Sequence, residues 1–160
     1  MFLADPLSMT TSPDVPVAGN AHVEEPLVER RSAFRALVVE DDDAILMLVR
    51  RVLEREGFNV EGTKTSAGAI QLLKTIAYDL LILDLKLPQE SGELVMTYLE
   101  GAQPHTLRRV IVMTASPRQL SCEFLERVCK VLSKPFDIDE LVLMARECVE
   151  SPSAASCPAP

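Results

Sequence analysis

The sequence predicts an α/β protein in which helices cover both faces of a five-stranded parallel sheet. Across residues 34–150, short apolar runs alternate five times with segments whose apolar residues recur at helical spacing. Such alternation is typical of parallel strands joined by right-handed helical crossovers. Aromatic residues make up only 4% of the chain and tryptophan is absent, so we expect a core of aliphatic side chains.

Both ends of the chain are predicted to be disordered tails. Residues 1–33 carry prolines among polar and acidic residues, and residues 151–160 read SPSAASCPAP. Neither segment shows a sustained helical or strand period. One domain, residues 34–150, remains, and its length is ordinary for a single hydrophobic core.

The first half of this domain contains two predicted strands and two predicted helices. Residues 36–39 are apolar and too few for a helix, so we expect a buried strand that ends at an acidic run. Apolar residues then recur at helical spacing, and Gly57 suits the end of that helix. Residues 58–60 predict a weaker strand, and Ser66 is expected to cap a second helix that extends to Ala77.

The second half continues the alternation. Residues 80–83 are the clearest strand, and a loop with Pro88 and Gly92 follows them. Asp137 is the predicted cap of the last helix, with Glu140 three residues further on. The remaining predicted elements are a helix at 93–99, a strand at 110–113, a helix at 118–127 and a short strand at 131–132.

Polar residues follow four of the five predicted strands. In chain order, the residues at these strand ends are Glu40 with Asp41, then Asp84, Thr114 and Lys134. Open α/β sheets bind their ligands at the carboxyl ends of the strands. We therefore expect these side chains to converge at one edge of the sheet.

Composition limits the classes of function. The formal net charge is −8 and the basic residues are scattered, which argues against a nucleic-acid-binding surface. No apolar stretch approaches the length of a membrane span, and the first residues lack the pattern of a secretory signal, so we expect a cytoplasmic protein without a membrane partner. The four cysteines lack CxxC spacing, and we expect them to be reduced thiols.

Four segments resemble the response-regulator receiver family. They are VVEDD at 38–42, LDLKLP at 83–88 with Ser91 and Gly92, VMTA at 112–115 and SKPF at 133–136. Each segment alone is a weak signal, but all four occur in the order and at the spacing of the family. Within the family, the chain resembles the single-domain regulators of the chemotaxis type. The resemblance implies a flavodoxin-like fold with strand order 2-1-3-4-5.

The same resemblance implies a function in two-component or phosphorelay signalling. Asp84 would accept a phosphoryl group from a sensor histidine kinase or a histidine phosphotransfer protein. Lys134 would neutralise charge on the transferring oxygens, and Thr114 would donate its hydroxyl to the bound group. No output domain is expected after residue 150, so the switch would act on a downstream effector protein.

A magnesium ion is part of this expectation. Three carboxylates brought together repel one another unless a cation lies between them, and Mg²⁺ prefers oxygen ligands. By resemblance, Asp41 would bind Mg²⁺ directly and Glu40 through water. Asp84 and the backbone carbonyl of Lys86 would complete the set of protein ligands.

Three features depart from the family pattern. Val131 stands where many receivers carry Tyr or Phe, which puts the route of signal transmission in doubt. The stretch between Thr114 and Lys134 is short, so we expect the fourth helix to be reduced or displaced. Lys86 can approach the phosphoryl group and change its lifetime, and the alternative is a lysine side chain that points into solvent.

Simpler interpretations stay open at this point. Asp42 and Asp43 can serve only to begin a helix, and His105 is expected to be exposed without a role. An alternative function is a receiver-like interaction module that is never phosphorylated. A phosphohydrolase of the haloacid-dehalogenase type needs a second Asp where this chain has Lys86. We therefore expect no enzyme beyond Mg²⁺-dependent self-phosphorylation and slow self-dephosphorylation.

Overall fold

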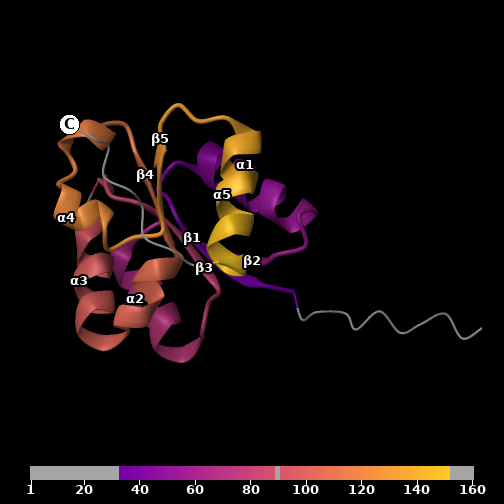
Figure 1. Ribbon diagram of the computed structural model, residues 1–160. Helices are drawn as coiled ribbons and strands as arrows, with labels where there is room; N and C mark the ends of the chain where they lie inside the picture. The colour runs from indigo at the N-terminus through magenta and orange to yellow at the C-terminus, as the bar shows by residue number, and fades with distance from the viewer. Residues whose placement is uncertain (1–32, 89–90, 152–160) are drawn as a thin grey trace, which may run out of the picture. The chain divides into compact units, whose positions relative to one another are not determined.

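Five parallel strands form one sheet in the computed structural model, which describes residues 33–88 and 91–151 (Figure 1). The strands are β1 (Arg35–Val39), β2 (Asn59–Thr63), β3 (Leu80–Asp84), β4 (Val110–Thr114) and β5 (Lys130–Ser133). Their order is β2-β1-β3-β4-β5, so the expected flavodoxin-like topology is confirmed. The predicted tails lie outside the described residues except for Ala33 and Ser151.

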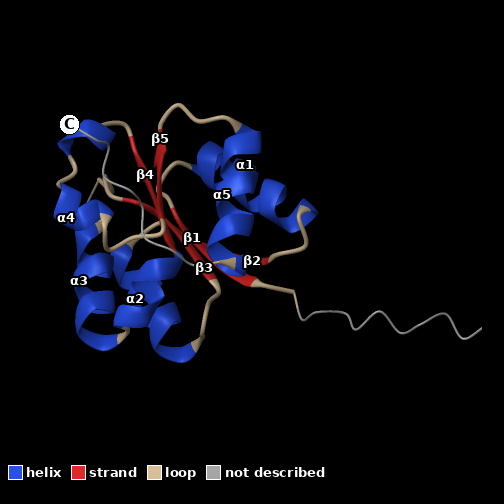
Figure 2. Ribbon diagram, in the orientation of Figure 1, coloured by secondary structure: helices blue, strands red, loops and turns tan. Residues whose placement is uncertain are grey.

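Helices connect the strands and cover both faces of the sheet (Figure 2). The α-helices are α1 (Asp43–Arg55), α2 (Ser66–Thr75), α3 (Glu93–Ala102), α4 (Cys122–Leu125) and α5 (Ile138–Glu150). Two short 3-10 helices are η1 (Pro104–Arg109) and η2 (Pro117–Gln119). Among the described residues, no helix combines the length and the apolar character needed to cross a membrane.

The core consists of two apolar layers, one on each side of the sheet. Val38 and Ile82 pack with α1 and α5, whereas Leu37 and Leu81 pack with α2 and α3. Successive strand residues point to opposite faces, so strands covered on both faces are apolar throughout. This explains why β1, β3 and β4 appear in the sequence as unbroken apolar runs.

Capping residues define the starts of the helices beside the carboxyl edge of the sheet. The Asp42 carboxylate accepts the N–H groups of Ala44 and Ile45 at 2.8 and 3.0 Å, which confirms its simpler interpretation as a helix cap. Asp137 begins α5 as predicted.

Gly57 follows the end of α1 with a φ of 88°, a left-handed conformation that glycine adopts without strain.

Some predicted boundaries are wrong. Strand β2 extends to Thr63 because its pairing with β1 continues to that residue. Thr65, rather than Ser66, caps α2 by accepting the N–H of Gly68 at 3.0 Å, and α2 ends before Ala77. The helix predicted at 118–127 is divided into η2 and the four-residue α4, which matches the expectation of a reduced fourth helix.

Two cysteines form a disulfide, so the expectation of reduced thiols is wrong for this pair. Cys129 lies directly before β5 and Cys148 lies near the end of α5, with 6.1 Å between their Cα atoms. Both are fully buried, because α5 packs its inner face over the start of β5. Cys148 follows Leu141 and Ala145 at helical spacing, and this spacing is the signal that could have placed it against the sheet.

Candidate functional site

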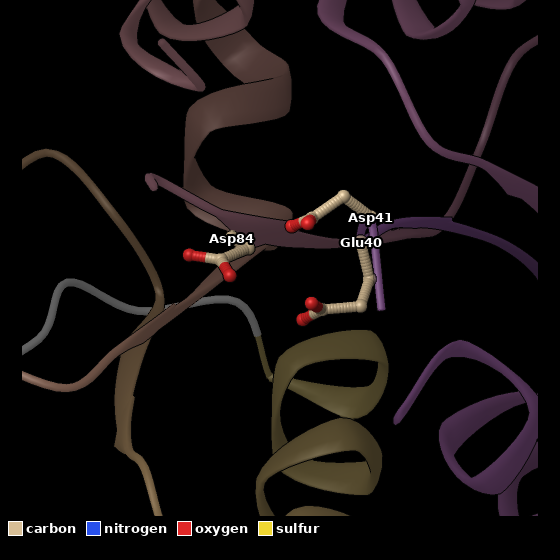
Figure 3. Close-up of side chains that lie close together, drawn as sticks. All are labelled: Glu40, Asp41 and Asp84. Atoms are coloured by element: carbon tan, nitrogen blue, oxygen red, sulfur yellow. The ribbon is translucent and has the colours of Figure 1, made fainter. Parts of the chain in front are cut away.

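Three carboxyl groups meet at the carboxyl edge of the sheet. Glu40 and Asp41 follow β1, and Asp84 ends the neighbouring strand β3. Each residue offers a carboxylate oxygen, and these oxygens all lie within 4.8 Å of one another. Figure 3 shows the three carboxyl groups near one another, with those of Glu40 and Asp41 turned toward the side on which Asp84 lies. We call these three residues the acidic cluster.

Lys134 places its amine against two members of the acidic cluster. Its Nζ donates hydrogen bonds to Glu40 Oε2 and to Asp84 Oδ2, each at 2.6 Å. The backbone N–H of Lys134 donates to the Thr114 carbonyl at 2.8 Å, which holds the residue at the end of β5, and its peptide bond to Pro135 is cis. The Lys134 side chain therefore reaches past the end of β4 toward β3 and β1.

Burial and charge act in opposite directions in this group. Burial raises the pKa of Glu40 above its ordinary value, against the lowering effect of Lys134. Burial alone would lower the pKa of Lys134, but hydrogen bonds and charges from Asp84 and Glu40 outweigh it, so the pKa is raised. Lys134 therefore remains an ammonium at neutral pH, and its charge favours the ionised form of the buried Glu40.

The loop after β3 folds tightly against Asp84. The N–H of Lys86 donates to Asp84 Oδ1 at 2.8 Å, and the N–H of Gly92 donates to the Leu85 carbonyl at 3.0 Å. A Cβ atom at Gly92 would overlap the backbone oxygen of Asp84, so only glycine permits this close approach. The Lys86 side chain itself is exposed.

Thr114 ends β4, the strand that pairs with β3. Its neighbour Met113 is in register with Asp84, and the buried Thr114 hydroxyl accepts the N–H of Ser116 at 3.0 Å. The structure thus places all the predicted site residues at one edge of the sheet. Hydrogen bonds and the close approach of the carboxylates link Glu40, Asp41, Asp84, Lys86 and Lys134, and Thr114 joins them through its carbonyl, which accepts the N–H of Lys134.

An apolar cavity adjoins the acidic cluster, and sequence analysis missed it. The cavity has a volume of about 470 Å³ and is lined by Ile45, Leu48, Lys134, Pro135 and Phe136. Leu48 belongs to the apolar residues that recur at helical spacing along α1, a pattern that predicts one buried face, yet Leu48 is 42% exposed. No periodic signal distinguishes an apolar residue beside a cavity from one in the core. We call this feature the α1 cavity.

Known proteins similar to this chain share the same domain. Cell cycle transcriptional regulator CtrA of Caulobacter vibrioides is 32% identical over 109 residues, which are 68% of this chain and 47% of that protein. Aerobic respiration control sensor protein ArcB of Escherichia coli is 31% identical over 117 residues, which are 72% of this chain and 15% of that protein. The chain therefore spans about half of the first relative and a small part of the second.

Solved structures agree with the fold. The receiver domain of Francisella response regulator 1452 superposes with a TM-score of 0.64 at 25% identity, covering 73% of this chain and 97% of that chain. The receiver domain of sensor histidine kinase PA1611 from Pseudomonas aeruginosa gives a TM-score of 0.66 at 22% identity, covering 74% and 99%. The response regulator receiver domain family matches residues 36–146. The chain belongs to this family.

Proposed function

We propose that Asp84 accepts a phosphoryl group from a phosphohistidine of a sensor histidine kinase or a histidine phosphotransfer protein, and that this changes contacts with a downstream effector protein. Receiver domains act in two-component signalling and interact with such phosphodonors. The observation that carries the proposal is the position of Asp84. Its carboxylate is buried at a strand end, lies 2.6 Å from the Lys134 amine and belongs to the acidic cluster.

In this mechanism an Asp84 carboxylate oxygen is the nucleophile. It forms a bond to phosphorus while the bond from phosphorus to the imidazole nitrogen breaks, and that nitrogen keeps the electron pair. The Lys134 amine already donates a hydrogen bond to Asp84, and it can also donate to the oxygens of the transferring phosphoryl group. Thr114 ends the adjacent strand and can donate its hydroxyl to the phosphoryl group after transfer.

The acidic cluster fits Mg²⁺ because its donors are all oxygen atoms that lie close together. Asp41, the least buried member of the acidic cluster, is the proposed direct ligand, and the buried Glu40 is assigned a contact through water. Asp84 and the Lys86 carbonyl complete the proposed ligands. Bound Mg²⁺ would supply positive charge next to the phosphoryl oxygens. The PA1611 receiver was solved with a magnesium ion in its active site cleft, which supports this choice.

The α1 cavity is the proposed surface for the phosphodonor protein. Lys134 forms part of its wall, so a partner that fills the cavity lies beside Asp84. Leu48 in the wall of this cavity is 42% exposed, so part of its apolar side chain is open to a partner. An amphipathic helix that carries the phosphohistidine can bury its apolar face on such a surface.

Thr114 is the proposed start of the response to phosphorylation. Its hydroxyl accepts the N–H of Ser116 now, and donation to a phosphoryl group would draw the segment after β4 toward Asp84. Val131 has no ring that could rotate, and it packs against the same apolar layer as Leu120 and Phe124. We therefore assign the output to movement of the segment between β4 and β5, read by an effector on the face of α4, β5 and α5.

Incubation with acetyl phosphate and Mg²⁺, followed by intact mass measurement, tests this function. The wild-type chain is expected to gain one phosphoryl group and Asp84→Asn is expected to gain none. Asp43→Asn is the matched control, because Asp43 lies at the same edge but is exposed and pairs with Lys64 outside the acidic cluster. No gain in the wild type would favour the unphosphorylated interaction module, and a gain that survives in Asp84→Asn would place the acceptor elsewhere.

Lys86→Asn is expected to change the lifetime of phosphorylated Asp84 several-fold. Lys86 follows the acceptor by two residues, and its N–H is bonded to the Asp84 carboxylate, so its side chain emerges beside the phosphoryl group. The decay of the phosphorylated mass after removal of the phosphodonor measures this rate. Lys74→Asn, which changes an exposed lysine in the last turn of α2, is the control. Equal decay of Lys86→Asn and the wild type would show that Lys86 points only into solvent.

Several expectations about the surroundings of the chain stay predictions. They are its cytoplasmic location, the absence of a nucleic-acid or membrane partner, and the self-phosphorylation and slow self-dephosphorylation of Asp84. Receiver domains are not enzymes in the usual sense. The mass experiment described above tests the phosphorylation chemistry directly.

A further inference from the structure

We infer that Ser66 is a positioning residue for phosphoryl transfer, acting through the loop between β3 and α3; this inference rests on the proposed function of Asp84. Ser66 is fully buried, and it is one of the few polar residues inside the described part of the domain. Its hydroxyl donates to the backbone oxygen of Ser91 at 3.0 Å, although the two residues are 25 positions apart. The hydroxyl therefore joins α2 to the loop that follows the phosphoacceptor.

The start of α2 does not use the Ser66 hydroxyl. Thr65 caps the helix through its own hydroxyl, which accepts the N–H of Gly68 at 3.0 Å. Ser66 is the first helical residue, and its hydroxyl bonds to a different element. A buried polar group costs free energy unless it has a hydrogen-bond partner, so this hydroxyl favours one position of the Ser91 carbonyl.

Contacts lead from Ser91 back to Asp84. The Ser91 hydroxyl accepts the N–H of Glu93 at 3.1 Å, which ties the same residue to the first turn of α3. Gly92 lies next to Ser91, donates its N–H to the Leu85 carbonyl at 3.0 Å and packs against the Asp84 backbone with no room for a Cβ atom. The end of the loop that Ser66 holds is therefore the end that presses on Asp84.

The start of the loop carries the proposed Mg²⁺ ligand. Lys86 follows Leu85 directly, and its N–H is bonded to Asp84 Oδ1 at 2.8 Å. Leu85 and Lys86 thus lie between Asp84 and Gly92, and a shift of Ser91 and Gly92 is transmitted to the Lys86 carbonyl. Groups hydrogen-bonded to a metal ligand change metal affinity about 10-fold to 100-fold when removed, and because Ser66 acts through Ser91 and Gly92 we expect an effect at the lower end of this range.

Ser66→Ala is expected to weaken Mg²⁺ binding about 10-fold, as measured by isothermal titration calorimetry of the full chain. The Mg²⁺ concentration for half-maximal phosphorylation by acetyl phosphate is expected to rise by the same factor, while the rate at saturating Mg²⁺ stays close to that of the wild type. Thr75→Ala is the matched control, because the Thr75 hydroxyl also donates to a backbone oxygen in α2, that of Leu72 at 3.2 Å, but at the far end of the helix. It is expected to leave Mg²⁺ binding unchanged.

The outcomes separate this inference from the proposed function. Equal Mg²⁺ affinity in Ser66→Ala and the wild type, or an equal loss in Thr75→Ala, overturns the role of Ser66. A wild-type chain that binds Mg²⁺ but gains no phosphoryl group overturns the proposed function, and calorimetry still decides whether Ser66 positions the loop. If Ser66→Ala does not fold, Ser66→Cys fills a similar volume with a weaker donor and carries the same expectation of reduced affinity.

Discussion

Replacing Lys134 with methionine is expected to slow phosphorylation of Asp84 about 100-fold to 1000-fold while strengthening Mg²⁺ binding. The rate falls because the Lys134 amine, now 2.6 Å from Asp84 Oδ2, no longer neutralises charge on the transferring oxygens. Mg²⁺ affinity rises because the acidic cluster loses its neighbouring positive charge. Without Mg²⁺ the variant is also expected to lose about 3 kcal/mol of unfolding free energy, since Glu40 is left buried without a cation.

Phosphorylation rates with acetyl phosphate, calorimetric Mg²⁺ titration and urea denaturation measure these three effects. Lys64→Met is the matched control. Lys64 also pairs with an aspartate near this edge, Asp43 at 2.6 Å, but both of those side chains are at least half exposed. Its removal is expected to change the unfolding free energy by less than about 1 kcal/mol. A Lys134→Met variant with weaker Mg²⁺ binding than the wild type would contradict the proposed arrangement of charges.

Loss of the Cys129–Cys148 disulfide is expected to lower the free energy of unfolding by about 3 kcal/mol. The bond joins residues 19 positions apart in the chain, and that segment contains β5, Lys134 and most of α5. Closing a loop of this length restricts the unfolded chain, and this restriction is the main source of the stabilisation. Urea denaturation of Cys148→Ala under oxidising conditions, compared with the oxidised wild type, measures the loss.

A double-mutant cycle separates the contribution of the disulfide to the free energy of unfolding from the contribution of packing by two buried sulfur atoms. Cys129→Ala and Cys148→Ala each remove the whole bond, so the double variant is expected to be little less stable than either single variant. The measured coupling between the two substitutions is then expected to approach the full value for the bond. Additive losses would instead show that no disulfide forms in the purified protein, in which case each substitution only leaves a small cavity.

The fold was predictable because its signals are local. Apolar runs at 80–83 and 110–113 are buried on both faces, so nothing in their pattern competes with a strand assignment. The weaker strand β2 lies at the edge of the sheet and has mixed burial, which explains why its length was underestimated. Helix α4 has only four residues, and so short an element produces no helical period.

The site residues at the ends of strands could be predicted from the sequence. Contacts between residues far apart in the chain could not. Glu40, Asp41 and Asp84 follow apolar strands, and a parallel sheet must bring such residues to one edge. The bond from Ser66 to Ser91 and the Cys129–Cys148 disulfide each join residues that only packing brings together. The sequence shows the serine and the cysteines but not their partners. A serine before a helix indicates a cap, and cysteines without close spacing indicate reduced thiols, so both contacts were missed.

Asp41 and Asp42 are adjacent in the chain yet serve different parts of the molecule. Asp41 belongs to the acidic cluster, and Asp42 caps the helix whose next turns line the α1 cavity. No spacer residue separates the two. An insertion or deletion between these residues would displace either the Asp41 carboxylate or α1. The segment therefore tolerates substitutions better than changes in length. The proposed acceptor site and the proposed surface for the phosphodonor are therefore fixed relative to each other by two adjacent residues.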